Sequence, residues 1–505
     1  MADELQFSTA PGRWVIAATA LGSGIAMIDA TVVGIALPTI GRSFHTPLGP
    51  LQWVVTGYTL TLGAFLLVGG SLGDRFGRRR LFSIGIAWFA LASVLCGIAP
   101  DGQLLIAMRA LQGVGGALLT PGSLAIIQAS FTPEDRARAI GAWSGLGGLA
   151  VAAGPVLGGY LVSAASWRWI FFINVPFALF VLAVSARHVP ESRDPSSTRG
   201  VDLPGAALGV VSLVGITYFL IEGSARGWGS PEVLASAAIA VAASIGFVSI
   251  ERSASSPMLP LDIFKNRQFS GTNAVTFVVY GALGGALFLV PIALQVVLRY
   301  SPLESGLSLV PITIIMLVFS ARSGRLASRI GPRLQMSVGP LVVAGGLALL
   351  VRAVSGSNYL EYVLPAILVF GSGLAITVAP LTATAMESAS SEHAGIASAV
   401  NNDVARLAGL VAVAILPWLA GITGMSYLHR HELHSEFQTA VLIASGLCAV
   451  GGVLAAVVIR NPARIRATPL ETAVAGHTAG FAAEGLHCAI DAPPLNCNSR
   501  YKQRN

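Results

Sequence analysis

Long apolar stretches separated by short polar connections run along most of the 505-residue chain. A helix that crosses the hydrocarbon core of a bilayer needs about 20 predominantly apolar residues. Because every backbone polar group must be paired inside that core, apolar stretches of this length predict an all-α integral membrane protein. The fourteen expected spans are Trp14–Ala36, Leu51–Leu72, Leu81–Ile98, Leu104–Ile127, Ala139–Val162, Trp169–Val184, Leu203–Ile221, Val233–Ile250, Ala274–Leu298, Gly306–Phe319, Met336–Val351, Tyr359–Ala383, Ala397–Ala420 and Ala440–Ile459.

One short loop pattern occurs twice, between long apolar stretches. Residues 70–79 read Gly-Ser-Leu-Gly-Asp-Arg-Phe-Gly-Arg-Arg, and residues 324–333 read Gly-Arg-Leu-Ala-Ser-Arg-Ile-Gly-Pro-Arg, an offset of 254 residues with five of ten positions identical. A repeat about half a chain apart is typical of transporters built from two related bundles. We therefore expect an N-terminal segment (1–13), a six-helix bundle (14–187), a linker (188–202), two inserted helices (203–250), a linker (251–269), a second six-helix bundle (270–460) and a disordered tail (461–505).

Composition and charge place this chain in a membrane and predict its orientation. Hydrophobic residues make up 54% of the chain and charged residues 11%, whereas soluble domains carry about 25% charged residues. Without two intramembrane arginines and three basic residues near the end, one set of connections holds 20 Lys and Arg and the other 6. Basic loops stay on the cytoplasmic side, so both termini are expected there. The net charge of +7 reflects this topology, and it does not indicate nucleic-acid binding.

A carboxylate and a guanidinium within the expected spans are the strongest candidates for chemistry. Asp29 lies roughly 10 Å and Arg109 roughly 8 Å from the outer ends of their helices, at about 1.5 Å per residue. An acid at that depth costs about 2.5–3.5 kcal/mol to insert, so it usually faces the bundle interior and has a purpose. The pair is interpreted as a proton-coupling site, and the alternative is a static ion pair that fixes helix packing. Second-rank polar residues are Glu222, Asp403 and Arg406, of which the last two can neutralise each other on one helix face.

The first copy of the repeated loop is a candidate gate. Its glycines allow a tight turn, and Asp74 can pair with a nearby arginine or face a helix N-terminus, for which the thirteenth span is the expected supplier. The alternative is that the arginines only set topology. The candidate gating residues are Gly70, Asp74, Arg75, Gly77, Arg78 and Arg79; in the second copy Ser328 replaces the acid.

Two other spans carry polar or small residues at helical spacing. The face of span four that carries Arg109 and Gln112 suits a cavity wall, although its glycines can equally serve close helix packing. Gln112, Trp53 and Tyr58 are candidate substrate contacts. In span five, glycines form a groove and a proline removes one backbone hydrogen bond; the candidate residues are Gly145, Gly154, Pro155, Gly158 and Gly159.

Several sequence segments resemble a known family. The loop at 70–81 is similar to the signature of the major facilitator superfamily. The segments 28–38 (Ile-Asp-Ala-Thr-Val-Val-Gly-Ile-Ala-Leu-Pro), 52–60 (Gln-Trp-Val-Val-Thr-Gly-Tyr-Thr-Leu), 109–113 (Arg-Ala-Leu-Gln-Gly), 154–159 (Gly-Pro-Val-Leu-Gly-Gly) and 167–176 (Trp-Arg-Trp-Ile-Phe-Phe-Ile-Asn-Val-Pro) resemble its fourteen-span drug:proton antiporters, of the EmrB/QacA type. The resemblance covers roughly residues 12–460. One departure is Gly34, where that family usually has Asn.

The resemblance implies proton-driven efflux of lipophilic drugs, dyes or antibiotics by a multi-pass protein of the cytoplasmic membrane. It also identifies the span-five pattern as the family's antiporter motif. We expect a monomer in lipid that uses the proton gradient, with no metal, no nucleotide cofactor and no nucleic-acid partner. A facilitator or a proton-coupled importer or exporter of a metabolite is the alternative. A membrane-embedded transferase is a remote one, because the acids are scattered and no phosphate-binding loop is present.

Overall fold

The computed structural model describes residues 5–193, 202–254, 259–356, 358–388 and 394–461. Both predicted linkers are therefore described only in part, and the predicted tail lies outside the described residues apart from Asn461. Within the described ranges the chain forms helices and one isolated bridge between Leu5 and Phe131, with no strand. The long helices are α1 (Ala10–Phe44), α2 (Leu48–Phe76), α3 (Arg78–Gly97), α4 (Gly102–Ser130), α5 (Pro133–Ala164), α7 (Asn174–His188), α8 (Leu203–Arg226), α9 (Pro231–Ser253), α10 (Arg267–Val296), α11 (Pro302–Ile330), α12 (Pro332–Ala353), α13 (Leu364–Glu387), α14 (Ala394–Leu419) and α15 (Arg430–Val458).

The predicted membrane spans are confirmed as helices. Thirteen described helices are long and apolar enough to cross a membrane, or 14 when the two parts of α2, which bends by 48°, are counted as one span. Most helices extend beyond the predicted apolar stretches on at least one side, because a helix continues into the polar region outside the hydrocarbon core, whereas α3, α10, α14 and α15 end one or two residues before the predicted ends. Two spans consist of two parts: the sixth is a short α6 (Trp169–Phe172) and α7 with Ile173 between them, and the twelfth is a π-helical turn, η2 (Tyr359–Val363), followed by α13.

The two halves of the chain repeat the same helix order. Adding the 254-residue sequence offset to the bounds of α2 leads to the bounds of α11, and adding it to Arg78, where α3 begins, leads to Pro332, where α12 begins. In the first bundle α4 packs on α2 and α3 while α1 packs on α5 and α7; in the second, α13 packs on α11 and α12 while α10 packs on α14 and α15. The expectation of two related six-helix bundles is confirmed.

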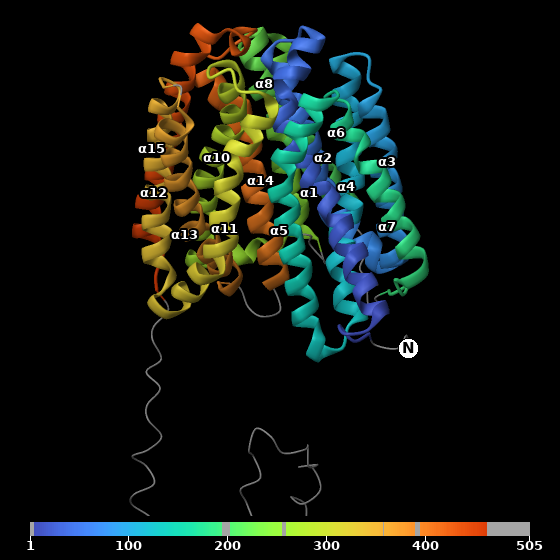
Figure 1. Cartoon of the computed structure of the whole chain (residues 1–505). Coiled ribbons are helices and arrows are strands. Elements are labelled where there is room, and N and C mark those ends of the chain that lie inside the picture. Colours follow the sequence, from blue (N-terminus) through green and yellow to red (C-terminus); the bar gives the residue numbers. More distant parts are fainter. Residues whose placement is uncertain (1–4, 194–201, 255–258, 357, 389–393, 462–505) are drawn as a thin grey trace, which may run out of the picture. The chain divides into compact units, whose positions relative to one another are not determined.

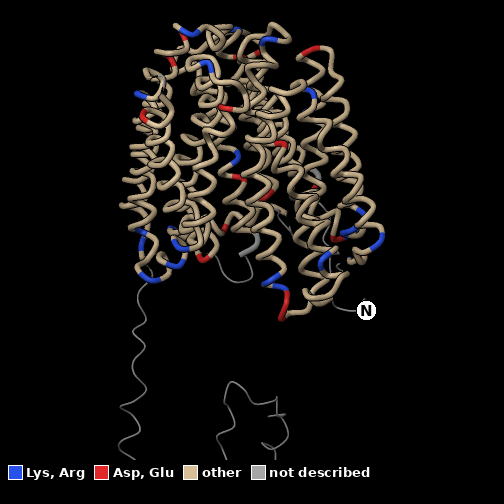
Figure 2. Tube along the Cα trace, in the orientation of Figure 1, with Lys and Arg blue, Asp and Glu red and all other residues tan. Residues whose placement is uncertain are grey.

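The inserted helices α8 and α9 pack against each other, and α8 also contacts α2 and α14 (Figure 1). α8, with α9 packed against it, therefore covers the seam where α2, the second helix of one bundle, meets α14, the fifth helix of the other. We call the membrane face at which α1 begins the loop face, since the repeated turns at Gly77 and Gly331 lie there; the opposite one is the far face. Charged residues lie mainly near the two faces, with few between (Figure 2).

The outer surface of the bundles is apolar, as a bilayer requires. Large side chains that face outward include Leu91, Leu179, Ile245 and Val457, each more than half exposed. In a soluble protein such a surface would favour aggregation, but here it faces lipid tails. The polar chemistry must therefore be sought between the helices.

Candidate functional site

Asp29 of α1 and Arg109 of α4 form an ion pair in the interior of the N-terminal bundle. Each is 1% exposed, and Arg109 Nη1 donates to Asp29 Oδ2. The sequence-based expectation that the two lie at the same depth is therefore confirmed. Burying two charges carries a large desolvation cost, which only good geometry and further hydrogen bonds can offset.

Two side-chain amides supply the further hydrogen bonds to Asp29. Gln112 Nε2 donates to Asp29 Oδ1 at 2.9 Å, and Asn174 Nδ2 donates to the same oxygen at 3.1 Å. Both amides also donate to Ser93 Oγ of α3, at 2.8 and 3.2 Å. Asn174 begins α7, directly after the break in span six. The carboxylate thus accepts from three side chains, a set that suits its ionised form.

The Arg109 guanidinium is held by contacts on its other sides. Its Nε donates to the Val54 carbonyl of α2 at 3.1 Å, and its Nη1 also donates to Gln112 Oε1 at 2.6 Å. The guanidinium carbon lies 4.3 Å from the centre of the Tyr58 ring and 5.7 Å from that of Phe171. A cation over an aromatic face is attracted by the ring quadrupole. We call Asp29, Arg109, Gln112, Asn174 and Ser93 the buried network.

In this conformation the three candidate substrate contacts, Gln112, Tyr58 and Trp53, pack against other helices. Gln112 is fully buried in the network and Tyr58 is 3% exposed beneath Arg109. Trp53 faces the inserted helices, where its Nε1 donates to Glu222 Oε1 at 3.1 Å. None of the three lines the pocket of about 510 Å³ that lies between α2, α8 and α14. The expected cavity wall on α4 is instead a packing face, since a Cβ at Gly113 would collide with Tyr58 and Thr61 of α2.

One half of α5 packs closely against other helices and the other half is open, and the residues of the span-five motif lie in both halves. A Cβ at Gly154 would collide with Thr31 of α1, and one at Gly159 would collide with Pro302 of α11; one at Gly158 would make a tight contact of 3.0 Å with Val32 of α1. Pro155 is part of the same contact, since its carbonyl oxygen would meet a Cβ added at Gly306 of α11. Toward the loop face, by contrast, no described atom lies within 4 Å of a Cβ added at Gly141, Gly145 or Gly148. Close packing therefore joins α5 to α11 only in its far half.

Hydrogen bonds between the two bundles follow the same division. Among the described residues they join Gln52 to Val413 and Ala414, Gln295 to Ile35, Leu303 to Ser163, Leu48 to Gly424, and Tyr427 to Thr46, all in the far half. Burial raises the pKa of Tyr427 to about 12, so its phenol stays protonated and donates to the Thr46 carbonyl at 2.8 Å. The bundles are thus joined at the far face.

The repeated loop forms the same turn in both halves. Gly77 has φ 113° and its counterpart Gly331 has φ 90°, a region of backbone conformation that side chains other than glycine rarely adopt. Asp74 pairs with Arg78 at 2.8 Å, one of the two partners expected for it, and no described contact joins it to α14. Gly70 packs near Pro121, and Arg75 lies over the Phe76 ring.

Each turn is also capped by a residue that the sequence analysis missed. Glu191 accepts from the Arg79 and Arg80 backbone N–H groups at 3.1 and 3.2 Å, three residues after α7 ends. Asn461 accepts from the Arg333 N–H at 3.1 Å, three residues after α15 ends. The arginine side chains reach the same helix ends, since Arg79 donates to the Val189 carbonyl and Arg333 to the Ala456 carbonyl. The last helix of each bundle thus anchors the third.

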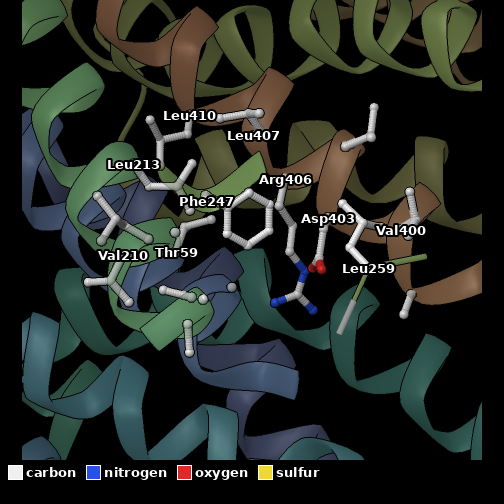
Figure 3. A pocket seen from close by; sticks show the side chains of 18 of the residues that line it. Thr59, Val210, Leu213, Phe247, Leu259, Val400, Asp403, Arg406, Leu407 and Leu410 are labelled. Atoms are coloured by element: carbon white, nitrogen blue, oxygen red, sulfur yellow. The ribbon is translucent and has the colours of Figure 1, made fainter. Parts of the chain in front are cut away.

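The remaining second-rank residues lie at the seam covered by the inserted helices. Glu222 pairs with Arg226 on α8 at 2.7 Å, and Trp228 in the turn that follows packs edge-on against Trp418 of α14. Asp403 and Arg406 line a pocket between α2, α8 and α14, with a volume of about 510 Å³ (Figure 3). No hydrogen bond or ion pair joins these two among the described residues, so the expected neutralisation by direct pairing is not seen.

Comparisons with known proteins agree with this architecture. The family model described as "Major Facilitator Superfamily" matches residues 19–413. The puromycin resistance protein pur8 of Streptomyces alboniger is 35% identical over 89% of this chain and 92% of the relative. A methylenomycin A resistance protein of Bacillus subtilis is 34% identical over 89% of this chain and 97% of the relative.

Solved structures show the same fold at low sequence identity. A bacterial homologue of the human lysosomal transporter Spinster, in an inward-facing and unoccupied conformation, aligns with a TM-score of 0.64 at 16% identity and covers 90% of this chain and all of that one. The helix repeat, the paired glycine turns and the family match over most of the chain lead to one assignment. This chain belongs to the major facilitator superfamily and is a membrane transporter, not an enzyme.

Proposed function

We propose that this protein exports lipophilic antibiotics or other drugs across the bacterial cytoplasmic membrane in exchange for protons, by alternating access. The single observation that carries the proposal is the buried network, in which an acid within the membrane is held by donors from α4 and α7. The names of the relatives, which are antibiotic resistance proteins, support the substrate class. The loop face is the cytoplasmic side in this proposal, because it carries most of the Lys and Arg.

In the proposed cycle, protonation of Asp29 is linked to the conformation of the transporter. Asp29 accepts from three side-chain donors here, and adding a proton to it removes the negative charge that attracts the Arg109 guanidinium. The conformation with its bundles joined at the far face therefore suits an empty proton site, ready to take up drug from the cytoplasm. A proton that arrives from outside would loosen the network, and the bundles would then rock so that the loop-face half closes.

The proton gradient supplies enough free energy for this exchange. One proton moving inward through about 100 mV and one pH unit releases about 2.3 plus about 1.4 kcal/mol. That sum corresponds to a gradient of about 500-fold for an uncharged drug, at about 1.4 kcal/mol per tenfold. The exchange therefore runs without a nucleotide cofactor.

Proteoliposomes carrying the Asp29→Asn variant test the proposal. Wild-type protein should accumulate a lipophilic drug when a proton gradient is imposed and lose it when an uncoupler is added, whereas Asp29→Asn should not accumulate it. Glu222→Gln is the matched control, because it removes an acid at a helix–helix contact outside the buried network. Equal accumulation by wild type and Asp29→Asn at equal reconstitution would refute the coupling role, and equilibration of the drug by the wild type without accumulation would favour the facilitator.

A further inference from the structure

The pocket at the seam is separate from the buried network. It lies between α2, α8 and α14, with Phe247 of α9 and Leu259 at its edge, and none of the five network residues lines it. Its volume of about 510 Å³ is within the range of about 300–1,000 Å³ that holds drug-sized ligands. Its residues on α8, and all of those on α14 except Leu407 and Leu410, lie in the loop-face halves of these helices. The pocket is therefore placed to receive a molecule from the loop-face side of the membrane.

Two charged side chains interrupt a lining that is apolar apart from Thr59. Asp403 and Arg406 project from α14 among Val210, Leu213 and Phe247 (Figure 3). At about 1.5 Å per residue, Arg406 lies about 18 Å along α14 from its first residue, near the middle of a hydrocarbon core of about 30 Å. Charged residues at that depth are rare and usually mark a substrate or ion pathway.

Neither charged side chain forms a hydrogen bond or an ion pair in the described part of the chain, although the two lie within electrostatic range of each other. Arg406 makes no described hydrogen bond or ion pair, and Asp403 Oδ1 is buried without a hydrogen-bond partner. A buried group left in this state costs about 1–3 kcal/mol, and more when it is charged. A ligand that offers a hydrogen-bond donor to Asp403 and an acceptor to Arg406 would remove that cost.

The charge balance selects among possible ligands. The carboxylate and the guanidinium lie three residues apart on α14, so the pocket has no net charge when both are ionised. A ligand with one net charge would be attracted by one group and repelled by the other. An uncharged ligand with adjacent donor and acceptor atoms, such as a carboxamide, can satisfy both groups while its apolar body contacts the walls.

We propose that this pocket is a binding site for uncharged lipophilic molecules that carry adjacent hydrogen-bond donor and acceptor groups. The inference rests on the proposed export function and assigns a substrate class and an entry site to it. It also assigns a role to the inserted helices, because α8 supplies one wall, where Gly205 and Gly209 leave room. Without α8 and α9 that wall would be replaced by lipid.

Three pyrene probes with the same apolar body test the charge preference: 1-pyrenebutyramide, 1-pyrenebutyrate and 4-(1-pyrenyl)butylammonium. Binding to the purified full chain in detergent is followed by energy transfer from tryptophan to pyrene. The wild type should bind the amide about tenfold more tightly than either ion, a difference of about 1.4 kcal/mol. Asp403→Asn leaves an unbalanced cation, so it should prefer the butyrate; Arg406→Gln leaves an unbalanced acid, so it should prefer the ammonium. The double variant should prefer the amide again.

A second pair of variants locates the binding. Gly63 of α2 lines the pocket and has no described atom within 4 Å of an added Cβ, so Gly63→Leu should fill the pocket and weaken amide binding about tenfold or more. Gly446 of α15 is equally free of close neighbours but lies outside the pocket, so Gly446→Leu is the matched control and should bind as the wild type does. Equal loss in both variants would contradict the assignment.

Failure of this inference can be told apart from failure of the export proposal. Asp29→Asn should lose drug accumulation and keep the probe preferences, because Asp29 does not line the pocket. Equal affinity of the three probes for the wild type, or unchanged preferences in Asp403→Asn and Arg406→Gln, would overturn the pocket assignment even if transport remained coupled to protons.

Discussion

At the scale of single residues, Asn174 is the member of the buried network that the sequence analysis did not single out. Its amide donates both to Asp29 Oδ1 and to Ser93 Oγ. Asn174 belongs to the segment 167–176, which resembles a family pattern. A polar residue within an apolar span is a signal that could have identified it as a candidate. Its direction toward Asp29 could not be predicted, because it depends on the break between α6 and α7.

Asn174→Ala should destabilise the protein by about 1–3 kcal/mol, since it removes two buried hydrogen bonds, one of them to a carboxylate, and leaves Gln112 as the remaining amide donor to Asp29 Oδ1 and Ser93 Oγ. Thermal unfolding in detergent measures the change. Asn402→Ala on α14 is the control: that side chain is exposed and donates only to the Ser398 carbonyl of its own helix, so its effect should stay within about 0.5 kcal/mol. Equal unfolding temperatures for Asn174→Ala and the wild type would show that Asn174 contributes little to the network.

Glu191→Ala should destabilise the turn at Gly77 by about 0.5–2 kcal/mol, the usual cost of removing a helix cap. The reason is that Glu191 accepts from both N–H groups at the start of α3. Glu191→Gln retains an acceptor oxygen and should lose less. Hydrogen exchange of the first turn of α3 reports the effect directly, and unchanged protection in Glu191→Ala would contradict the capping role.

At the scale of helices, α5 combines a tightly packed half with an open one. Gly154→Leu should destabilise the protein by about 1–3 kcal/mol, because the new side chain collides with Thr31 of α1. Gly145→Leu should fold as the wild type does, since no described atom lies within 4 Å of its Cβ. Thermal unfolding compares the two, and equal losses would show that the open half is packed in solution.

Gly145→Leu has a separate expected effect on the proposed cycle. Closing the loop-face half would bring α5 toward the C-terminal bundle, where an added side chain would be in the way. We expect slower drug accumulation by this variant at normal stability, with spin-label distances across the loop face shifted toward the open conformation. Transport at the wild-type rate would argue against closure at Gly145.

At the scale of the whole molecule, the contacts between the bundles can be locked. Leu303 N donates to Ser163 Oγ at 3.2 Å across the far half, so cysteines at these two positions should form a disulfide in this conformation. The variant is made with Cys96, Cys448, Cys488 and Cys497 replaced by alanine. Oxidation should abolish drug accumulation and leave pyrene-amide binding intact, and a reducing agent should restore accumulation. Accumulation that persists in the oxidised protein would exclude opening at the far face.

The patterns along the chain were sufficient for the spans, the two-bundle repeat and the contact of Asp29 with Arg109. Each of these depends on local properties: the length of apolar stretches, a repeated turn that needs glycine at residues 77 and 331, and helix depth at a constant rise per residue. The other features of the site depend on how the helices pack against one another. The direction of Gln112, the capping by Glu191 and the pocket around Arg406 arise from side chains distant in sequence that meet between helices, and no local pattern encodes which faces of those helices will touch.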